Sequence, residues 1–228
     1  MWRAQLEALE EAGIEARAID LPGHGTRMAE RFTLAASMEA IDAAVDSLRG
    51  PVVLCGLSLG GYLSLHWAGG VGHGRIDGVI AASCGTTPAG AALEGYRLIA
   101  AGIQRLPDRG AALNHAMVSA FLREPGRSDV ERGGVALDVM ADGLREIGAV
   151  RPIASISRIR TPLLLINGQF DHFRIQERSY LAAARARPGL PAEWSQLLVI
   201  PGASHLVSLA RPVEFSRALL GALQDVEP

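Results

Sequence analysis

The sequence predicts an α/β fold in which helices cover both faces of a mostly parallel sheet. Short apolar runs typical of buried strands alternate with helical patterns over residues 1–84 and again over 161–228. Residues 85–160 show helical patterns but no convincing strand. Hydrophobic residues make up 49% of the 228 residues and charged residues 20%, which excludes a disordered chain. We therefore expect one α/β core, formed by 1–84 and 161–228, with a helical insertion at 85–160.

In the first half, glycine or proline bounds most of the expected elements. The first apolar residues fall at helical spacing before Gly13, and a second apolar helical face ends at Gly50. The sequence PVVLC at 51–55 is a continuous apolar run, as in strands buried on both faces. In order, we expect a helix ending near Gly13, a strand over 16–21, a helix around 38–48, a strand over 51–55, a helix from about Leu59 and a strand over 76–83.

The second half contains the insertion and the rest of the core. Within the insertion, the helical patches lie at 93–106, 111–122 and 130–147. The alternation then resumes with two buried-strand patterns, PLLLING at 162–168 and LLVI at 197–200. We expect a helix around 177–185 between these strands and a closing helix after Pro212.

Composition excludes several functions and sites. All 22 basic residues are arginine and the net charge is −2, so we expect neither nucleic-acid binding nor an anionic membrane surface as partner. Lysine-dependent P-loop or Schiff-base chemistry is excluded. Cys55 and Cys84 form no disulfide framework, and no His, Cys or Asp pair has metal-ligand spacing, so we expect no metal. No apolar run approaches the roughly 18 residues of a membrane span and the start is acidic, which favours a cytoplasmic protein.

The strongest local motif is GLSLGG at 56–61, which follows an expected strand and precedes an expected helix. In a G-x-S-x-G turn the serine stands at a sharp, strained corner, and we expect Gly56 and Gly60 to leave room for close backbone. Ser58 would lie at the carboxyl end of the sheet, where α/β folds bind ligands. The Leu59 N–H, at the helix start, would point toward an oxyanion. The alternative is a glycine-rich turn with an incidental serine.

Two further residues complete a candidate catalytic triad. A serine hydroxyl needs a base to accept its proton, and the base needs an orienting acid. Asp171 follows the expected strand at 162–168, and His205 follows the one at 197–200. Both would lie at the same sheet edge as Ser58, in the chain order expected for this architecture. We therefore predict Ser58 as nucleophile, His205 as base and Asp171 as orienting acid; a surface aspartate and a loop histidine are the alternative.

Two other histidines are weaker candidates for substrate binding. His172 adjoins Asp171 and would line the pocket, whereas His24, in LPGHG, shapes a turn or borders the site.

Four motifs together resemble the α/β-hydrolase superfamily, most closely its small bacterial serine hydrolases that carry a lid. These motifs are IDLPGHG, CGLSLGG, INGQFDH and PGASH, and they span residues 19–205. The resemblance implies that Ser58, Asp171 and His205 are nucleophile, acid and base, and that the Leu59 N–H is one oxyanion donor. It further implies that 85–160 is a lid whose inner face selects the acyl group, and that no cofactor is required.

The start of the sequence departs from that family's pattern. Members normally have strands before the first helix that end in a His-Gly turn, whose loop supplies the second oxyanion donor. Here Met1 already stands where that helix begins, and a strand expected between 16–21 and 51–55 is missing. Three explanations are open for the missing strand. The strands at 16–21 and 51–55 close up on one another, another segment or chain fills the place between them, or the sequence is an N-terminally shortened reading of a longer gene. The last is favoured, so a chain extended upstream should be more soluble and more active.

The function that these residues favour is hydrolysis of a carboxylic ester or thioester through an acyl-enzyme. An apolar insertion with several arginines suits a small, mainly apolar or mildly anionic acyl group; these arginines are Arg97, Arg105, Arg109 and Arg123. Lactones, methyl esters and acyl carriers all stay open as substrate classes. One alternative is a ligand-binding or catalytically impaired protein that lacks one oxyanion donor. Another is a cofactor-free perhydrolase, which uses the same triad with peroxide in place of water.

Overall fold

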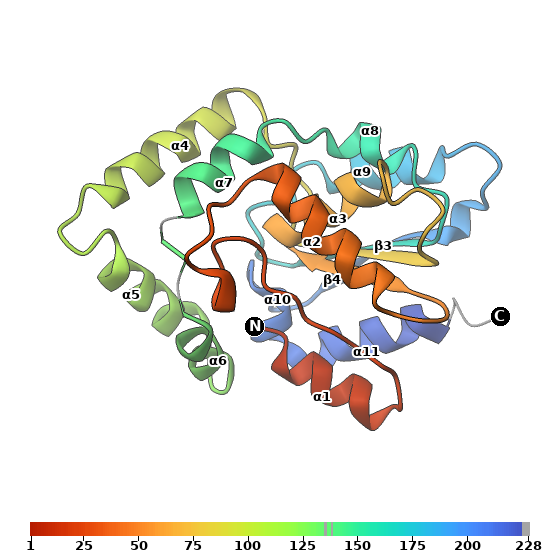
Figure 1. Ribbon diagram of the computed structural model, residues 1–228, viewed down its shortest axis with the longest axis horizontal. Helices are drawn as coiled ribbons and strands as arrows, with labels where there is room; N and C mark the ends of the chain where they lie inside the picture. The colour runs from red at the N-terminus through yellow and green to blue at the C-terminus, as the bar shows by residue number, and fades with distance from the viewer. Residues whose placement is uncertain (135, 138, 225–228) are drawn as a thin grey trace.

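The computed structural model describes residues 1–134, 136–137 and 139–224. Its core is a four-stranded parallel sheet with helices on both faces, as the sequence predicts (Figure 1). The strands lie in chain order, β1-β2-β3-β4, and every neighbouring pair is parallel. Their bounds are β1 Val53–Leu57, β2 Gly78–Ala82, β3 Leu163–Gly168 and β4 Ser195–Ile200.

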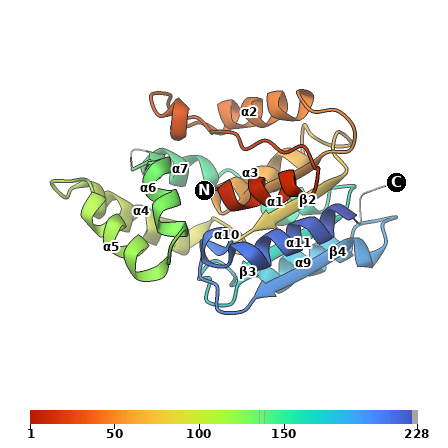
Figure 2. The same cartoon turned by 90° about the horizontal axis from the view of Figure 1, so that it is seen from below.

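Two helical layers enclose the sheet. The first layer comprises α2 (Leu34–Asp46), α3 (Leu59–Ala68), α8 (Pro152–Ile156) and α9 (Glu177–Arg185). Its apolar side chains belong to the larger of the hydrophobic clusters that form the core. The other contains α1 (Arg3–Glu11), α10 (Val207–Ala210) and α11 (Pro212–Gln224). Within it, α1 and α11 lie side by side (Figure 2), and the rings of Trp2 and Phe215 are 6.0 Å apart. Two short 3₁₀ turns lie at Gly25–Arg27 and Ala192–Trp194.

The described part of the predicted insertion, 85–160, contains helices and no strand. Besides α8 it forms α4 (Gly90–Gln104), α5 (Ala111–Phe121), α6 (Gly126–Gly133) and α7 (Val139–Ile147). The helical patch expected at 130–147 falls across α6 and α7, with residues 135 and 138 outside the described ranges. Arg3 of α1 joins this region to the core, because its Nε donates to the buried Asp129 of α6 at 2.8 Å.

The strand predicted over 16–21 is wrong. After α1 the chain runs back between α1 and α2 without forming a strand (Figure 2). A strand needs a neighbour about 4.8 Å away to pair its backbone groups, but β1 pairs only with β2. A cavity of about 580 Å³ is lined by residues 14–19 and by all of β1. The two segments therefore do not close up on one another.

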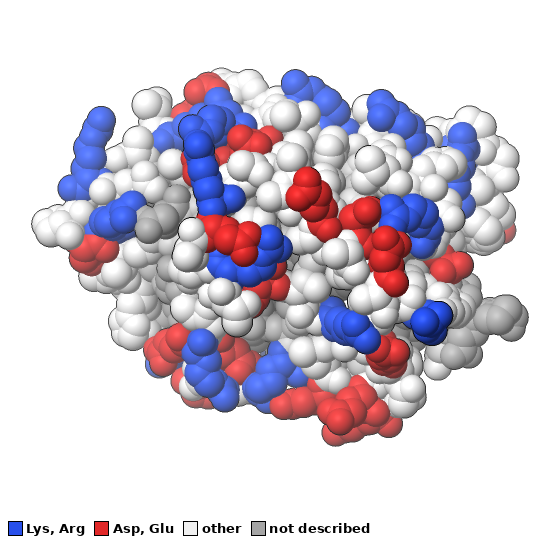
Figure 3. Space-filling model, viewed as in Figure 1, with Lys and Arg blue, Asp and Glu red and all other residues white. Residues whose placement is uncertain are grey.

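The surface carries charges of both signs. On the face seen in Figure 3, arginines and acidic residues are interspersed, in keeping with the net charge of −2. None of the helices in the described residues has both the length and the apolar character that crossing a membrane requires.

Candidate active site

Ser58 stands at the corner between β1 and α3. Its φ of 55° and ψ of −117° are unusual for a residue with a side chain, as expected at a strained strand-to-helix turn. The Ser58 N–H donates to the carbonyl of Ala82 in β2 at 2.7 Å, which holds the turn against the sheet. The serine therefore lies at the carboxyl end of β1, where the sequence predicts it.

The two glycines of the motif differ in their surroundings. A Cβ on Gly56 would lie 2.2 Å from the carbonyl oxygen of Gly60 and 2.5 Å from Ser64 Oγ, so only glycine fits there. At Gly60 a Cβ would meet no atom within 4 Å. The expectation that Gly60 leaves room for close backbone is therefore wrong. The close contact at this turn is between the backbone of Gly60 and the position that a Cβ on Gly56 would take.

We expect Gly56→Ala to destabilise the protein strongly and Gly60→Ala to have little effect. In Gly56→Ala the new methyl group forces the backbone of Gly56 and Gly60 apart, and overpacking of this kind lowers the free energy of unfolding by about 3 kcal/mol. The second places a methyl group in open space in the first turn of α3, where the free energy of unfolding should change by less than about 1 kcal/mol. Urea denaturation of both variants checks this, and equal midpoints would contradict the role given to Gly56.

The structure brings the three predicted triad residues together. His205 Nε2 lies 2.9 Å from Ser58 Oγ, and His205 Nδ1 lies 2.9 Å from Asp171 Oδ1. With a proton on Nδ1, the imidazole donates to Asp171 and can accept the serine proton at Nε2. Asp171 follows β3 and His205 follows β4, 147 residues after Ser58 in the chain. One continuous hydrogen-bonded chain thus joins a hydroxyl, an imidazole and a carboxylate.

Local hydrogen bonds position the acid and the base. Asp171 Oδ1 also accepts from the Phe173 N–H at 2.9 Å, which fixes the carboxylate in its turn. Ser83 Oγ, at the end of β2, donates to the carbonyl of His205 at 2.7 Å. The residues after three neighbouring strands therefore contact one another, because parallel strands end at the same sheet edge.

Asp171 is only 4% exposed, yet the charged form of its carboxyl group is favoured. Burial by itself would raise its pKa. The hydrogen bond from His205, the positive charge that His205 can carry and the Phe173 N–H outweigh burial, and they hold the pKa below its usual range. Asp171 is therefore an anion at neutral pH, as an acid that orients an imidazole must be.

The backbone N–H of Leu59 is available for an oxyanion. Leu59 is the first residue of α3, and the first hydrogen bond of this helix is donated by Tyr62 to the carbonyl of Ser58. No described residue accepts a hydrogen bond from the Leu59 N–H, as is usual in the first turn of a helix. The positive end of the helix dipole adds to its attraction for negative charge.

His172 lies beside the triad in an aromatic cluster that the sequence did not reveal. It is exposed, and its ring centre is 5.0 Å from that of His205. Desolvation of its ring by the neighbouring side chains, and then the nearby His205, lower the pKa of His172, so it is mostly neutral at pH 7. Phe173 lies 5.0 Å from His205, and Tyr96 of α4 stacks on Phe173 at 5.2 Å. Nothing in the sequence connects Tyr96 with a turn 75 residues further along the chain.

His24 makes no described hydrogen bond with the triad. Its Nδ1 lies 3.1 Å from the carbonyl of Pro22, and its ring meets Phe32 edge-on at 6.1 Å, so it shapes its own turn. It also lines the 580 Å³ cavity, as Ser58 does.

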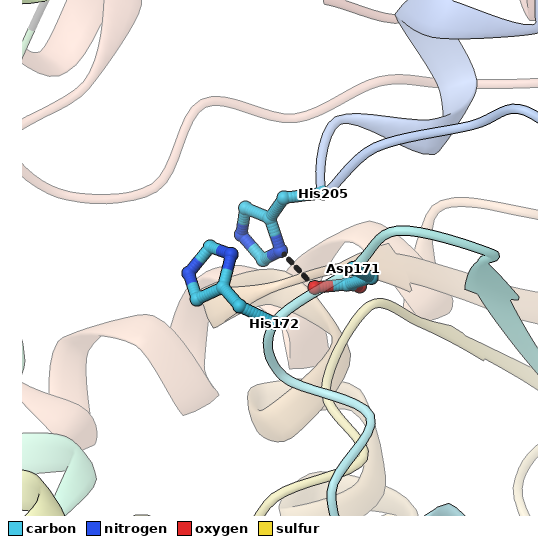
Figure 4. A group of neighbouring side chains, drawn as sticks. All are labelled: Asp171, His172 and His205. Carbon is cyan, nitrogen blue, oxygen red and sulfur yellow. Dashed lines mark hydrogen bonds and ion pairs between the residues drawn. The ribbon is translucent and has the colours of Figure 1, made fainter.

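The donor atoms of Asp171, His172 and His205 lie within 4.8 Å of one another (Figure 4). The sequence did not indicate this spacing, because it arises from the approach of two loops. The hydrogen bond between His205 and Asp171 already uses two of these donors. The arrangement is that of an acid–base pair with a neighbouring imidazole.

Known proteins resemble this chain over almost its whole length. The sequence model of the "Alpha/beta hydrolase family" matches residues 1–218. A pimeloyl-[acyl-carrier protein] methyl ester esterase from Stenotrophomonas maltophilia is 29% identical over 226 residues, which cover 92% of this chain and 83% of that protein.

Solved structures show the same fold. A thermophilic esterase from Thermogutta terrifontis has a TM-score of 0.75 and 24% identity, over 100% of this chain and 85% of that chain. A bromoperoxidase from Bacillus anthracis has a TM-score of 0.74 and 21% identity, over 98% and 87% of the two chains. At these identities the likeness extends to the fold alone.

Proposed function

Because the chain belongs to the alpha/beta hydrolase family, we propose that it hydrolyses carboxylic esters with Ser58 as the nucleophile. The observation that carries this proposal is the hydrogen-bonded chain from Ser58 through His205 to Asp171, with 2.9 Å at both contacts. Such a chain activates a hydroxyl that is otherwise a weak nucleophile. The similarity to a methyl ester esterase supports an ester as substrate.

In the first half-reaction, Ser58 Oγ attacks the ester carbonyl carbon while His205 Nε2 takes its proton. The negative charge that develops on the carbonyl oxygen is stabilised by the Leu59 N–H at the start of α3. Asp171 keeps the imidazole in the correct tautomer and stabilises its positive charge without accepting a proton. The ester C–O bond then breaks, and His205 returns the proton to the departing alcohol.

In the second half-reaction, water attacks the acyl group on Ser58. His205 removes a proton from this water and then returns it to Ser58 Oγ as the acid leaves. The aromatic rings of Tyr96 and Phe173 beside the base offer an apolar surface to the substrate. We therefore assign a small, mainly apolar acyl group to the site, with thioesters as a further class of the same chemistry.

A series of p-nitrophenyl esters tests this function. We expect measurable turnover of the acetate and butyrate, with a lower kcat/KM for the octanoate because the acyl group is small. Release of p-nitrophenol is followed by absorbance, with buffer alone as the control for spontaneous hydrolysis. A folded protein that turns over none of these esters, nor a methyl ester or a thioester of butyric acid, would instead be a binding protein with this fold.

A further inference from the structure

Three aromatic side chains form a continuous surface beside the catalytic base. The ring centres of His172 and of Phe173 each lie 5.0 Å from that of His205, and Figure 4 shows the two imidazoles side by side. The rings of His172 and Phe173 are 4.3 Å apart. Tyr96 of α4 stacks on Phe173 at 5.2 Å, with 29° between the ring planes. We call Tyr96, His172 and Phe173 the aromatic wall.

The composition of the chain makes this concentration of rings unusual. Phe, Trp and Tyr make up only 5% of the residues, whereas hydrophobic residues as a whole make up 49%. An apolar surface beside the triad would therefore be expected to be aliphatic. Several of the other aromatic side chains fill the core and are almost completely buried; they are Phe32, Trp67, Tyr180 and Phe215. The aromatic wall thus has a different use from the aromatic residues of the core.

The rings of the aromatic wall are accessible. Tyr96 is 37% exposed, His172 is exposed and Phe173 is half-buried. The imidazole of His205 contacts the aromatic wall, and its Nε2 lies 2.9 Å from Ser58 Oγ. A group carried on an ester that reacts with Ser58 therefore has the aromatic wall within reach.

We propose that the aromatic wall selects esters that carry an aromatic ring one methylene group away from the ester, with Tyr96 and Phe173 as the residues that determine this specificity. The inference rests on the proposed ester hydrolysis by Ser58. Aromatic rings attract one another in offset or edge-to-face arrangements, in addition to the gain from burial. A saturated ring lacks this attraction, which corresponds to about a 2- to 10-fold difference in affinity.

Two pairs of esters of matched size test this selectivity. Methyl phenylacetate is compared with methyl cyclohexylacetate, and benzyl acetate with cyclohexylmethyl acetate. The methylene group separates each ring from the ester, and burial alone would favour the more hydrophobic cyclohexyl ring. We expect kcat/KM to be about 2- to 10-fold higher for the aromatic ester of at least one pair, measured by titration of the released acid. The pair that shows the preference tells whether the ring belongs to the acid or to the alcohol.

Three variants and a matched control locate the selectivity. In Tyr96→Leu and in Phe173→Leu the ratio of kcat/KM between the two esters should fall to about one, and Tyr96→Phe should keep the parent ratio because it keeps the ring. Phe173→Leu retains the backbone N–H that donates to Asp171. The control is Phe170→Leu, since Phe170 is 70% exposed in the same turn and makes no ring contact with another described aromatic residue. A purely structural defect would lower the rates of both esters and leave their ratio unchanged.

Binding to the Ser58→Ala protein separates this inference from the proposed function. Calorimetry should show tighter binding of the aromatic ester by the same 2- to 10-fold, because binding does not require turnover. If the parent protein hydrolyses none of the four esters, the proposed function fails, and the binding preference still decides the role of the aromatic wall. Equal or weaker binding and turnover of the aromatic ester in both pairs would overturn the proposal. So would a parent ratio that persists in both leucine variants of the aromatic wall, or one that is lost in Phe170→Leu.

Discussion

Replacement of Ser58 by alanine is expected to lower kcat for p-nitrophenyl butyrate by about 10⁶-fold, the loss seen when a serine hydrolase loses its nucleophile. The Oγ atom 2.9 Å from His205 is the only part of the side chain removed. Without it, no acyl-enzyme can form, and what is left is catalysis by binding and by the oxyanion donor. The Tm should stay close to that of the parent protein.

The matched control is Ser47→Ala. Ser47 is an exposed serine at the end of α2, and its Oγ donates to the carbonyl of Ala44 at 2.7 Å. Its removal should leave kcat unchanged within about twofold, because it is remote from the triad. A Ser58→Ala protein that keeps more than a hundredth of the parent kcat would show that another residue is the nucleophile.

The Asp171→Asn variant is expected to lose about 10⁴ in kcat, with little change of shape. The amide nitrogen can donate a hydrogen bond to His205 Nδ1, which favours the tautomer whose proton is on Nε2. That tautomer cannot accept the proton of Ser58 Oγ at 2.9 Å. The amide also lacks the negative charge that stabilises the imidazolium in the transition state.

For this variant, the control is Asp46→Asn. Asp46 lies at the exposed end of α2 and pairs with Arg75, so its charge is far more screened than that of Asp171. Steady-state kinetics on p-nitrophenyl butyrate should give parent values for Asp46→Asn. An Asp171→Asn protein within tenfold of the parent would mean that Asp171 does not orient the base.

The sequence was most informative where a local pattern and the tertiary fold impose the same requirement. The apolar run at 162–168 corresponds to β3, which is buried over most of its length, as strands covered on both faces must be. The run at 197–200 corresponds to the end of β4, an edge strand that is buried only in part. The positions of Asp171 and His205 after these strands were enough to place them near Ser58. Parallel strands that end at one edge convert chain order into spatial proximity.

The sequence was least informative where the outcome depends on a neighbour. Residues 16–21 have a strand-like pattern, but this pattern cannot show that a cavity lies between them and β1, the strand with which they would pair. Gly60 matches the motif although its Cβ position is open. The stacking of Tyr96 on Phe173 joins α4 to the turn after β3, and no periodicity in either segment encodes it.

The activation of Ser58 by His205 is tested most directly by reaction with a fluorophosphonate, followed by mass spectrometry of the digested protein. An activated serine attacks the phosphorus, and the stable adduct marks the side chain that reacted. We expect one adduct, on the peptide that contains Ser58, and loss of ester hydrolysis in proportion to labelling. Full hydrolytic activity in a protein that carries no adduct, or an inactivating adduct on a different residue, would contradict this assignment.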